Sequence, residues 1–294
     1  MPPIRTLVLD SFLLRTVDLA EVDPRVLHAL SVGVRWPHRV PDWRTLLAAG
    51  RGIAAVDEIG RAVGSAMWFP YSDGFATIGM VITSPRLQAH GAGRWLMDQI
   101  LAAAGPRAFG LNATREAHRL YQSLGFVDEA TLYQRQGRAL PPEDAPLPPG
   151  ATLRAAQPAD LDALVRLDAR AFGAPRPALL AHLLAAGAGT VLARDGRIEA
   201  YALSRPFGRG QVVGPLVAAC DGDAIAVGRP HVAAQAGRFL RLDTRRADGP
   251  FAAFLARSGL AVFDTLTTMS LGRSWPAPEP DGPVTYALAS QALS

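Results

Sequence analysis

The chain has 294 residues, 49% of them apolar, and is long enough for one large or two ordinary globular domains. Its 30 basic residues are all Arg and are spread over both halves, with a net charge of +4, so the basic run typical of nucleic-acid or anionic-membrane binding is absent. The single Cys220 excludes an internal disulfide, the six His show no metal-ligand spacing, and no apolar run approaches the ~18 residues of a membrane-spanning helix. We therefore expect a soluble, cytoplasmic protein without a bound metal.

A proline-rich segment, 140–150 (LPPEDAPLPPG), interrupts the chain near its middle. Proline disfavours both helix and sheet and stiffens the backbone, so this segment is predicted to be an interdomain linker. It separates a first domain, 1–139, from a second, 151–273. The remaining residues, 274–294, form a C-terminal tail with apolar side chains that we expect to pack back on the body.

Hydrophobic periodicity and turn residues predict the elements of the first half. In chain order we expect a strand, two helices, three strands, a helix, a strand, a helix and a closing strand. They span 12–19, 24–34, 41–50, 52–58, 62–71, 74–83, 91–105, 108–113, 115–126 and 126–138.

After the linker the same order returns, which predicts a diverged internal duplication of an α/β unit with a mixed sheet. The second set is a strand, two helices, a hairpin, a strand, a helix, a strand, a helix and a closing strand. They span 151–157, 158–172, 175–187, 189–206, 211–219, 223–237, 238–244, 249–260 and 261–272.

The turn QAHGAG, residues 88–93, lies between a predicted strand and a helix and suits a phosphate site. A P-loop requires a lysine, and the chain has none. A dinucleotide-binding fingerprint requires a third glycine where Leu96 stands, which makes that interpretation weak. Gly91 and Gly93 remain compatible with a turn whose backbone N–H groups hold a pyrophosphate, because no Cβ blocks its approach.

Two motifs in order resemble the acetyl-CoA signature of the GNAT N-acetyltransferase superfamily. The first is [QR]xxGx[GA], present as Gln88, Gly91 and Gly93; the second is AxxxYxxxGF, present at 117–126. The resemblance covers residues 12–138 and implies two tandem GNAT-type domains, the first with the acetyl-CoA site.

The resemblance implies which residues bind acetyl-CoA. The strand edge 81–83 would pair with the pantetheine arm, the turn 89–94 would bind the pyrophosphate, and Thr114 stands where many relatives carry Asn. The implied cofactor-binding residues are Val81, Ile82, Thr83, Gln88, Ala89, His90, Gly91, Ala92, Gly93, Arg94, Asn112, Thr114 and Tyr121.

For the chemistry, the resemblance assigns Tyr121 as the acid for the departing thiolate and a backbone N–H near Val81 as the donor to the thioester carbonyl. Relatives carry a catalytic Glu where this chain has Gly79 or Asn112, so a base is not evident. His38 is the candidate replacement, because its ordinary pKa lies near working pH.

The acceptor side is predicted in the segment RWPHRVPDW, 35–43, between the first two helices. Its aromatic rings would suit an alkyl or cationic group, and its carboxylate could pair with an amine. The candidate substrate-binding residues are Trp36, His38, Asp42, Trp43, Phe69 and Tyr71.

In the second half the glycine motif is missing, and Leu255 and Leu260 occupy the tyrosine and phenylalanine positions. We expect this half to support the first, shape the acceptor pocket or mediate a homodimer, with a divergent second site as the alternative. The leading hypothesis is an acetyl-CoA-dependent N-acetyltransferase acting on a small primary amine. Acetylation of a protein amine and a non-catalytic acyl-CoA-binding regulator stay open.

Overall fold

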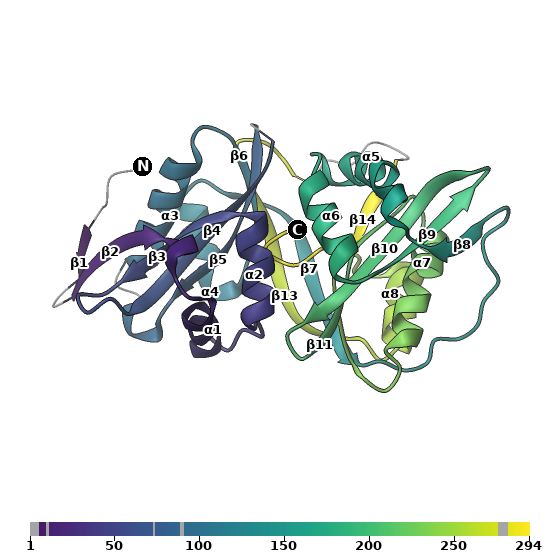
Figure 1. Ribbon diagram of the computed structural model, residues 1–294, viewed down its shortest axis with the longest axis horizontal. Helices are drawn as coiled ribbons and strands as arrows, with labels where there is room; N and C mark the ends of the chain where they lie inside the picture. Colours follow the sequence, from purple (N-terminus) through teal and green to yellow (C-terminus); the bar gives the residue numbers. More distant parts are fainter. Residues whose placement is uncertain (1–5, 10–11, 73, 89–90, 276–281) are drawn as a thin grey trace.

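The computed structural model describes residues 6–9, 12–72, 74–88, 91–275 and 282–294. It forms two lobes that meet along a central pair of strands (Figure 1). Among the helices so described, none has both the length and the apolar character needed to span a bilayer. Within the same ranges, no three His, Cys, Asp or Glu residues are grouped so that they could hold a metal ion.

The first half begins with a short strand, β1 (Thr6–Leu9), and then follows the predicted order. Its elements are β2 (Phe12–Asp18), α1 (Pro24–Gly33), α2 (Val40–Ala49), β3 (Arg51–Val56), β4 (Ala62–Ser72), β5 (Phe75–Thr83), α3 (Ala92–Ala104), β6 (Ala108–Ala113), α4 (Arg115–Ser123) and β7 (Val127–Arg138). Local chemistry explains the helix starts: Asp23 caps α1 by accepting from the Arg25 N–H at 2.8 Å, and Pro24 occupies the first helical position.

The second half repeats this order, which confirms the predicted duplication of an α/β unit. Its elements are β8 (Thr152–Ala155), α5 (Leu161–Phe172), α6 (Pro177–Ala186), β9 (Ala188–Arg194), β10 (Arg197–Phe207), β11 (Gly210–Ala218), α7 (Asp221–Ala234), β12 (Phe239–Thr244), α8 (Gly249–Arg257), β13 (Ala261–Leu271) and β14 (Val284–Ala287). Residues 140–148, in the segment predicted as a linker, belong to neither a helix nor a strand.

The two halves exchange their last strands, which the sequence order does not reveal. Strand β13 inserts between β6 and β7, and β7 pairs on its other side with β12. The pairing is antiparallel throughout, with Thr267 opposite Ala113 and Tyr133 opposite Thr244. One sheet therefore runs through both lobes, with β7 and β13 at its centre (Figure 1).

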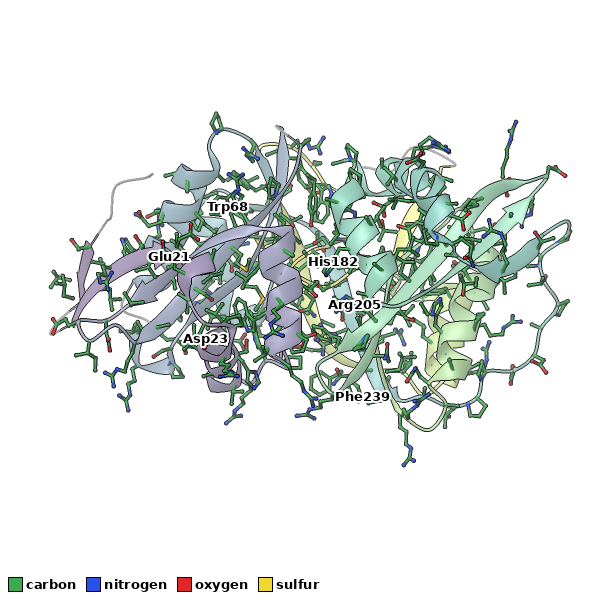
Figure 2. The ribbon with its side chains drawn as sticks, viewed as in Figure 1. Glu21, Asp23, Trp68, His182, Arg205 and Phe239 are labelled. Carbon is green, nitrogen blue, oxygen red and sulfur yellow. The ribbon has the colours of Figure 1, made fainter. Side chains whose placement is uncertain are left out.

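The lobes also share a hydrophobic core. Side chains of α1, α2 and β4 pack in one buried cluster with those of α5, α6 and the C-terminal tail. At the lobe boundary, where Figure 2 labels His182, its Nε2 lies 3.3 Å from Thr45 Oγ1. This shared burial and the continuous sheet hold the lobes in a fixed relation.

The tail packs between the lobes. Strand β14 pairs with β11, and Tyr286 and Leu288 are 2% and 1% exposed. The fully buried Arg176 forms a 2.7 Å ion pair with Asp168 and also donates to the Leu293 carbonyl at 3.1 Å. The tail is thus anchored by hydrogen bonds as well as by apolar contact.

Candidate active site

A groove opens where β5 and β6 separate. The two strands pair in parallel from Phe75 and Ala108 to Ile78 and Leu111, while β5 continues to Thr83. A bulge lies in this part of β5, because Ser65 pairs with Ile82 but Met67 pairs with Gly79. A bulge changes the direction of backbone groups, so the edge of β5 beyond Ile78 can bond to a ligand instead of a strand.

The positive φ of two residues shapes this groove. Met80 has φ 52° within the bulge, and its carbonyl accepts from Ser65 Oγ at 2.8 Å. Gly91 caps α3 at φ 84°, a conformation that glycine adopts without a Cβ penalty. Helix α3 begins at the groove, because Gly91, Gly93 and Arg94 line it. The first N–H groups of an α-helix have no partner within the helix, so a helix start favours an anion.

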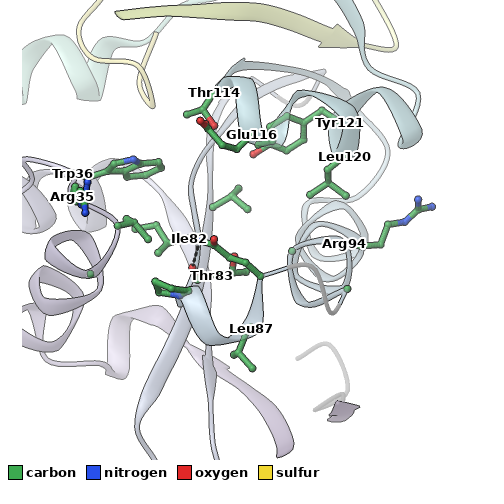
Figure 3. A pocket seen from close by; sticks show the side chains of 18 residues that line it. Arg35, Trp36, Ile82, Thr83, Leu87, Arg94, Thr114, Glu116, Leu120 and Tyr121 are labelled. Carbon is green, nitrogen blue, oxygen red and sulfur yellow. Dashed lines mark hydrogen bonds between the residues drawn. The ribbon is translucent and has the colours of Figure 1, made fainter. Parts of the chain in front are cut away.

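The groove contains a cavity of about 610 Å³. Figure 3 shows Trp36 and Arg35 on one wall, Tyr121 and Leu120 of α4 on another, and Thr83 between them. The Arg94 guanidinium points away from the cavity, and its Nη1 donates to Ser123 Oγ at 3.1 Å. Polar backbone, a helix N-terminus and apolar walls suit an extended ligand with a phosphate group.

Most of the residues that the resemblance implied for acetyl-CoA line this cavity. They are Val81, Ile82, Thr83, Gln88, Gly91, Gly93, Arg94, Thr114 and Tyr121. Ala92 is instead packed against Leu14 and Leu87, and Ala89 and His90 lie outside the described residues.

Asn112 differs from that expectation. Its Nδ2 donates to the Gln291 carbonyl at 2.8 Å and to Ser294 Oγ at 3.0 Å, and its Oδ1 accepts from Thr268 Oγ1 at 2.8 Å. The side chain thus binds the tail and β13, and it lines a second, smaller cavity.

The smaller cavity, about 200 Å³, adjoins the first. The two share Arg35, Trp36, Val81, Thr114, Ala117 and Tyr121. Its other walls come from the loop between α1 and α2, from β12 and β13 of the second half, and from the tail. The larger and the smaller cavity therefore meet at Tyr121 and Val81.

Tyr121 is 6% exposed and packs against Phe126 at 6.0 Å between ring centroids. Burial raises the pKa of its hydroxyl well above the ordinary value of 10. The hydroxyl therefore keeps its proton at physiological pH, as a proton donor must.

His38 lines the smaller cavity, but its environment does not suit a general base. Burial, then Arg241 and Arg205, lower its pKa from 6.5 to about 3, and its Nδ1 is enclosed without a hydrogen-bond partner among the described residues. The ring packs between Trp36, Trp43 and Phe207. An imidazole with this pKa is neutral at pH 7 and accepts a proton weakly.

Four predicted acceptor residues, Asp42, Trp43, Phe69 and Tyr71, line neither cavity. Asp42 accepts from the backbone N–H groups of Arg39 and Gly208 at 2.7 and 3.1 Å, so its carboxylate caps α2 and joins the lobes. Trp43 and Phe69 are fully buried in the shared core. Tyr71 donates to the tail carbonyl of Leu293 at 2.7 Å. Packing and capping account for these four side chains.

Several pocket residues escaped the sequence analysis because they lie on β7, on strands of the second half or in the tail, outside the two motifs. Gln134 of β7, Arg241 of β12, Asp264 of β13 and Gln291 of the tail all line the smaller cavity. For Gln134, Arg241 and Asp264, the alternation of side chains along a strand predicts only which face of the sheet they occupy. Their meeting with Tyr121 depends on the strand exchange.

In the second half, the groove equivalent to the one between β5 and β6 is closed. Strands β11 and β12 pair only at 211–212, and β14 then pairs with β11 along the edge that is open in β5. Helix α7 begins with Asp221 and Asp223, which oppose anion binding, and the fully buried Leu255 replaces the tyrosine. This half therefore lacks the features that would bind acetyl-CoA in the first.

The duplicated α/β fold has one groove at an open strand edge, as expected of the acyltransferase class that the sequence motifs resemble. Two family models, each described as an acetyltransferase (GNAT) domain, match residues 49–128 and 164–281. The chain belongs to the GNAT acetyltransferase family and carries two such domains in tandem, as predicted from the motifs of the first half and the repeated order of elements.

Similar proteins agree with this assignment. The chain is 29% identical over 145 residues to the uncharacterized N-acetyltransferase YitH of Bacillus subtilis, a match that covers 48% of this chain and about half (51%) of that relative.

Among solved structures, a proposed acetyltransferase of Pyrococcus horikoshii aligns over 98% of both chains with a TM-score of 0.77 and 18% identity. A tandem GNAT protein from the clavulanic acid biosynthesis pathway aligns over 89% of this chain and 99% of its own, with a TM-score of 0.62 and 15% identity. These structures show the shared fold.

Proposed function

We propose that the protein is an acetyl-CoA-dependent N-acetyltransferase that modifies a primary amine of a small molecule. The observation that carries the proposal is the junction of two cavities at Tyr121 and Val81, one long with a helix N-terminus and one short and enclosed. Acetyl-CoA supplies the activated acetyl group. The residues of the larger cavity would hold it, with the phosphates at the start of α3 and the pantetheine arm along β5.

The protein's own groups would orient the thioester and protonate the leaving thiolate. The backbone N–H groups in the bulge around Val81 would polarise the thioester carbonyl, and the Tyr121 hydroxyl would supply a proton to the leaving thiolate. Since His38 is a weak base, we expect the acceptor to react as its neutral form, with its proton lost to solvent. The rate should then rise with pH towards the pKa of the amine.

The enclosed shape of the smaller cavity favours a small acceptor over a protein. The tail closes it on one side: a Cβ at Gly79 would lie 2.6 Å from the Ala292 Cβ. Strands of the second half close another side. A cavity of about 200 Å³ accommodates a compact amine more readily than an extended polypeptide flanking a lysine.

Thiol release from acetyl-CoA against a panel of small amines and lysine peptides tests the proposal, with mass spectrometry of the products. Acetylation of small amines supports it. Turnover confined to peptides contradicts the small-molecule assignment. Tight acetyl-CoA binding without turnover of any amine would instead indicate a regulator.

A further inference from the structure

The smaller cavity has a polar wall made by three neighbouring strands. Gln134 of β7 lies opposite Asp243 of β12 on one side and opposite Asp264 of β13 on the other. Directly opposed residues of antiparallel strands project to the same face, as do residues two apart on one strand. Arg241 therefore shares this face, and Gln134, Asp264 and Arg241 all line the cavity.

Arg241 is held rigidly at this wall. Its Nε lies 3.1 Å from both carboxylate oxygens of Asp243, and its Nη2 lies 2.8 Å from Oδ2. The side chains of Arg241 and Asp243 are 6% and 1% exposed. These contacts, within the described part of the chain, leave Nη1 without an acceptor. Nη1 is not fully enclosed, and Arg241 lines the cavity, so this N–H₂ group is the part of the guanidinium available to a ligand.

A second guanidinium adds to the positive charge behind this wall. Arg205 and Arg241 each place their Cζ 5.3 Å from the centroid of the Phe207 ring. The Nε of Arg205 is enclosed without a hydrogen-bond partner in the ranges described, while its Nη2 donates to the Ala289 carbonyl at 3.2 Å. Within those ranges Arg205 thus has no carboxylate bonded to it, and its charge is uncompensated by direct pairing.

The charge pattern of the cavity is uneven. Arg241 is buried, whereas Asp264 is exposed and uses one oxygen to accept from the Thr265 N–H at 2.8 Å. Among the described residues that line the cavity, Asp264 is the sole carboxylate. The carboxylate of Asp243 offsets the charge of Arg241, so the feature that suits a carboxylate is the free N–H₂ edge of a fixed guanidinium.

We propose that Arg241 binds a carboxylate of the acceptor, so that the substrates are small amines that also carry a carboxylate group. This inference rests on the proposed acetyltransferase function and deepens it. The donor site belongs to the first half, while the residue that selects the acceptor belongs to the second. Asp264, at the exposed end, disfavours the carboxylate there and so helps to fix the direction in which the acceptor lies.

Matched acceptors separate the effect of the carboxylate from that of the amine. The experiment measures kcat/KM for acetyl-CoA-dependent acetylation of a panel of α-, β- and γ-amino acids and of their amides, which retain the amine but lose the negative charge. A charge-assisted hydrogen bond corresponds to roughly 10- to 100-fold. We expect the acids to be preferred over the amides by at least about tenfold. Equal or better use of the amides would overturn the proposal.

The variant must avoid leaving a buried charge unpaired, so both partners are changed together: Arg241→Gln with Asp243→Asn. We expect the preference for acids to fall to within about threefold, and Arg241→Lys, which keeps the charge but loses the planar fork, to give an intermediate value. The matched control is Arg194→Gln with Asp223→Asn, an ion pair of β9 and α7 with a buried carboxylate that lines neither cavity. It should keep the full preference.

The outcomes distinguish failure of this inference from failure of the proposed function. If amines are acetylated without regard to the carboxylate, or if Asp264→Asn and not the Arg241 variants abolishes the selectivity, the inference is wrong and the acetyltransferase function stands. If no amine is acetylated, calorimetry with N-acetyl amino acids and their amides, on protein saturated with CoA, still decides the matter. Carboxylate-dependent binding lost in the double variant supports the inference, and its absence in the wild type refutes it.

Discussion

Replacing Gly93 by Asp should separate the stability of α3 from its ability to bind acetyl-CoA. Gly93 is the second residue of α3, whose first turn contains no acidic residue. A carboxylate there interacts favourably with the helix dipole by about 0.3 to 1 kcal/mol, and replacing a helical glycine adds a few tenths more. A Cβ at Gly93 would lie 3.3 Å from Leu120 Cδ2, a contact that a small shift of a partly buried leucine relieves. The fold should therefore be as stable as the wild type or slightly more so.

Ligand binding should change in the opposite direction, because Gly93 lines the larger cavity. A unit charge about 5 Å from one phosphate charge costs about 1.7 kcal/mol at an effective dielectric constant of about 40. Two phosphates make this roughly 3 kcal/mol, which corresponds to a loss of affinity of about 100-fold. The side chain also occupies space that the glycine leaves open.

The matched control is Gly222→Asp, at the second position of α7 in the other half, where a Cβ would meet no atom closer than 3.9 Å. Calorimetric titration with acetyl-CoA and thermal unfolding of both variants give the two readouts. Gly222→Asp should bind as the wild type does. If Gly93→Asp keeps its affinity within about twofold while remaining folded, the start of α3 is not the pyrophosphate site.

Further changes test the roles of single residues and of the strand exchange. Tyr121→Phe should lower kcat more than about tenfold with an unchanged Kd for acetyl-CoA, and undiminished kcat would exclude the acid role. Folded His38 has a pKa of about 3 against 6.5 unfolded, so stability falls as pH drops through this window. His38→Gln should therefore reduce the slope of unfolding free energy with pH by up to about 1.4 kcal/mol per unit, and an unchanged slope in urea titrations would contradict the burial. Asp168→Asn leaves Arg176 buried without its partner and should destabilise the chain by about 3 to 5 kcal/mol in the same assay. A fragment 1–139 should lack the native sheet by circular dichroism, because β6 and β7 lose β13 between them; a cooperatively folding fragment would refute this.

The sequence predicted local features well and pairings between distant strands poorly. The order of elements followed from periodicity and turn residues, and the motif around Gly91 and Tyr121 located the larger cavity because its residues lie close together in the chain. The residues proposed to contact the acceptor were harder to predict from the sequence. Trp43 and Tyr71 have the side chains of a binding wall, but their faces of α2 and β4 turn to the shared core and the tail. Neither hydropathy nor spacing specifies which partner a buried aromatic ring meets.

Through the strand exchange the second half contributes to the smaller cavity, although its own equivalent groove is closed. Because β13 lies between β6 and β7, the wall of the acceptor cavity is made of strands from both halves, and neither half alone can supply it. In the second half, β14 of the tail closes the equivalent groove by pairing with β11. In the first half, the tail residue Gln291 accepts from Asn112, and Ala292 packs against Gly79. Gly79 stands where the resemblance places a catalytic Glu, and a side chain there would collide with Ala292 of the tail. The larger cavity is thus lined by residues of the first half alone, from Gly33 to Tyr121, whereas the smaller cavity exists only where the two halves and the tail meet.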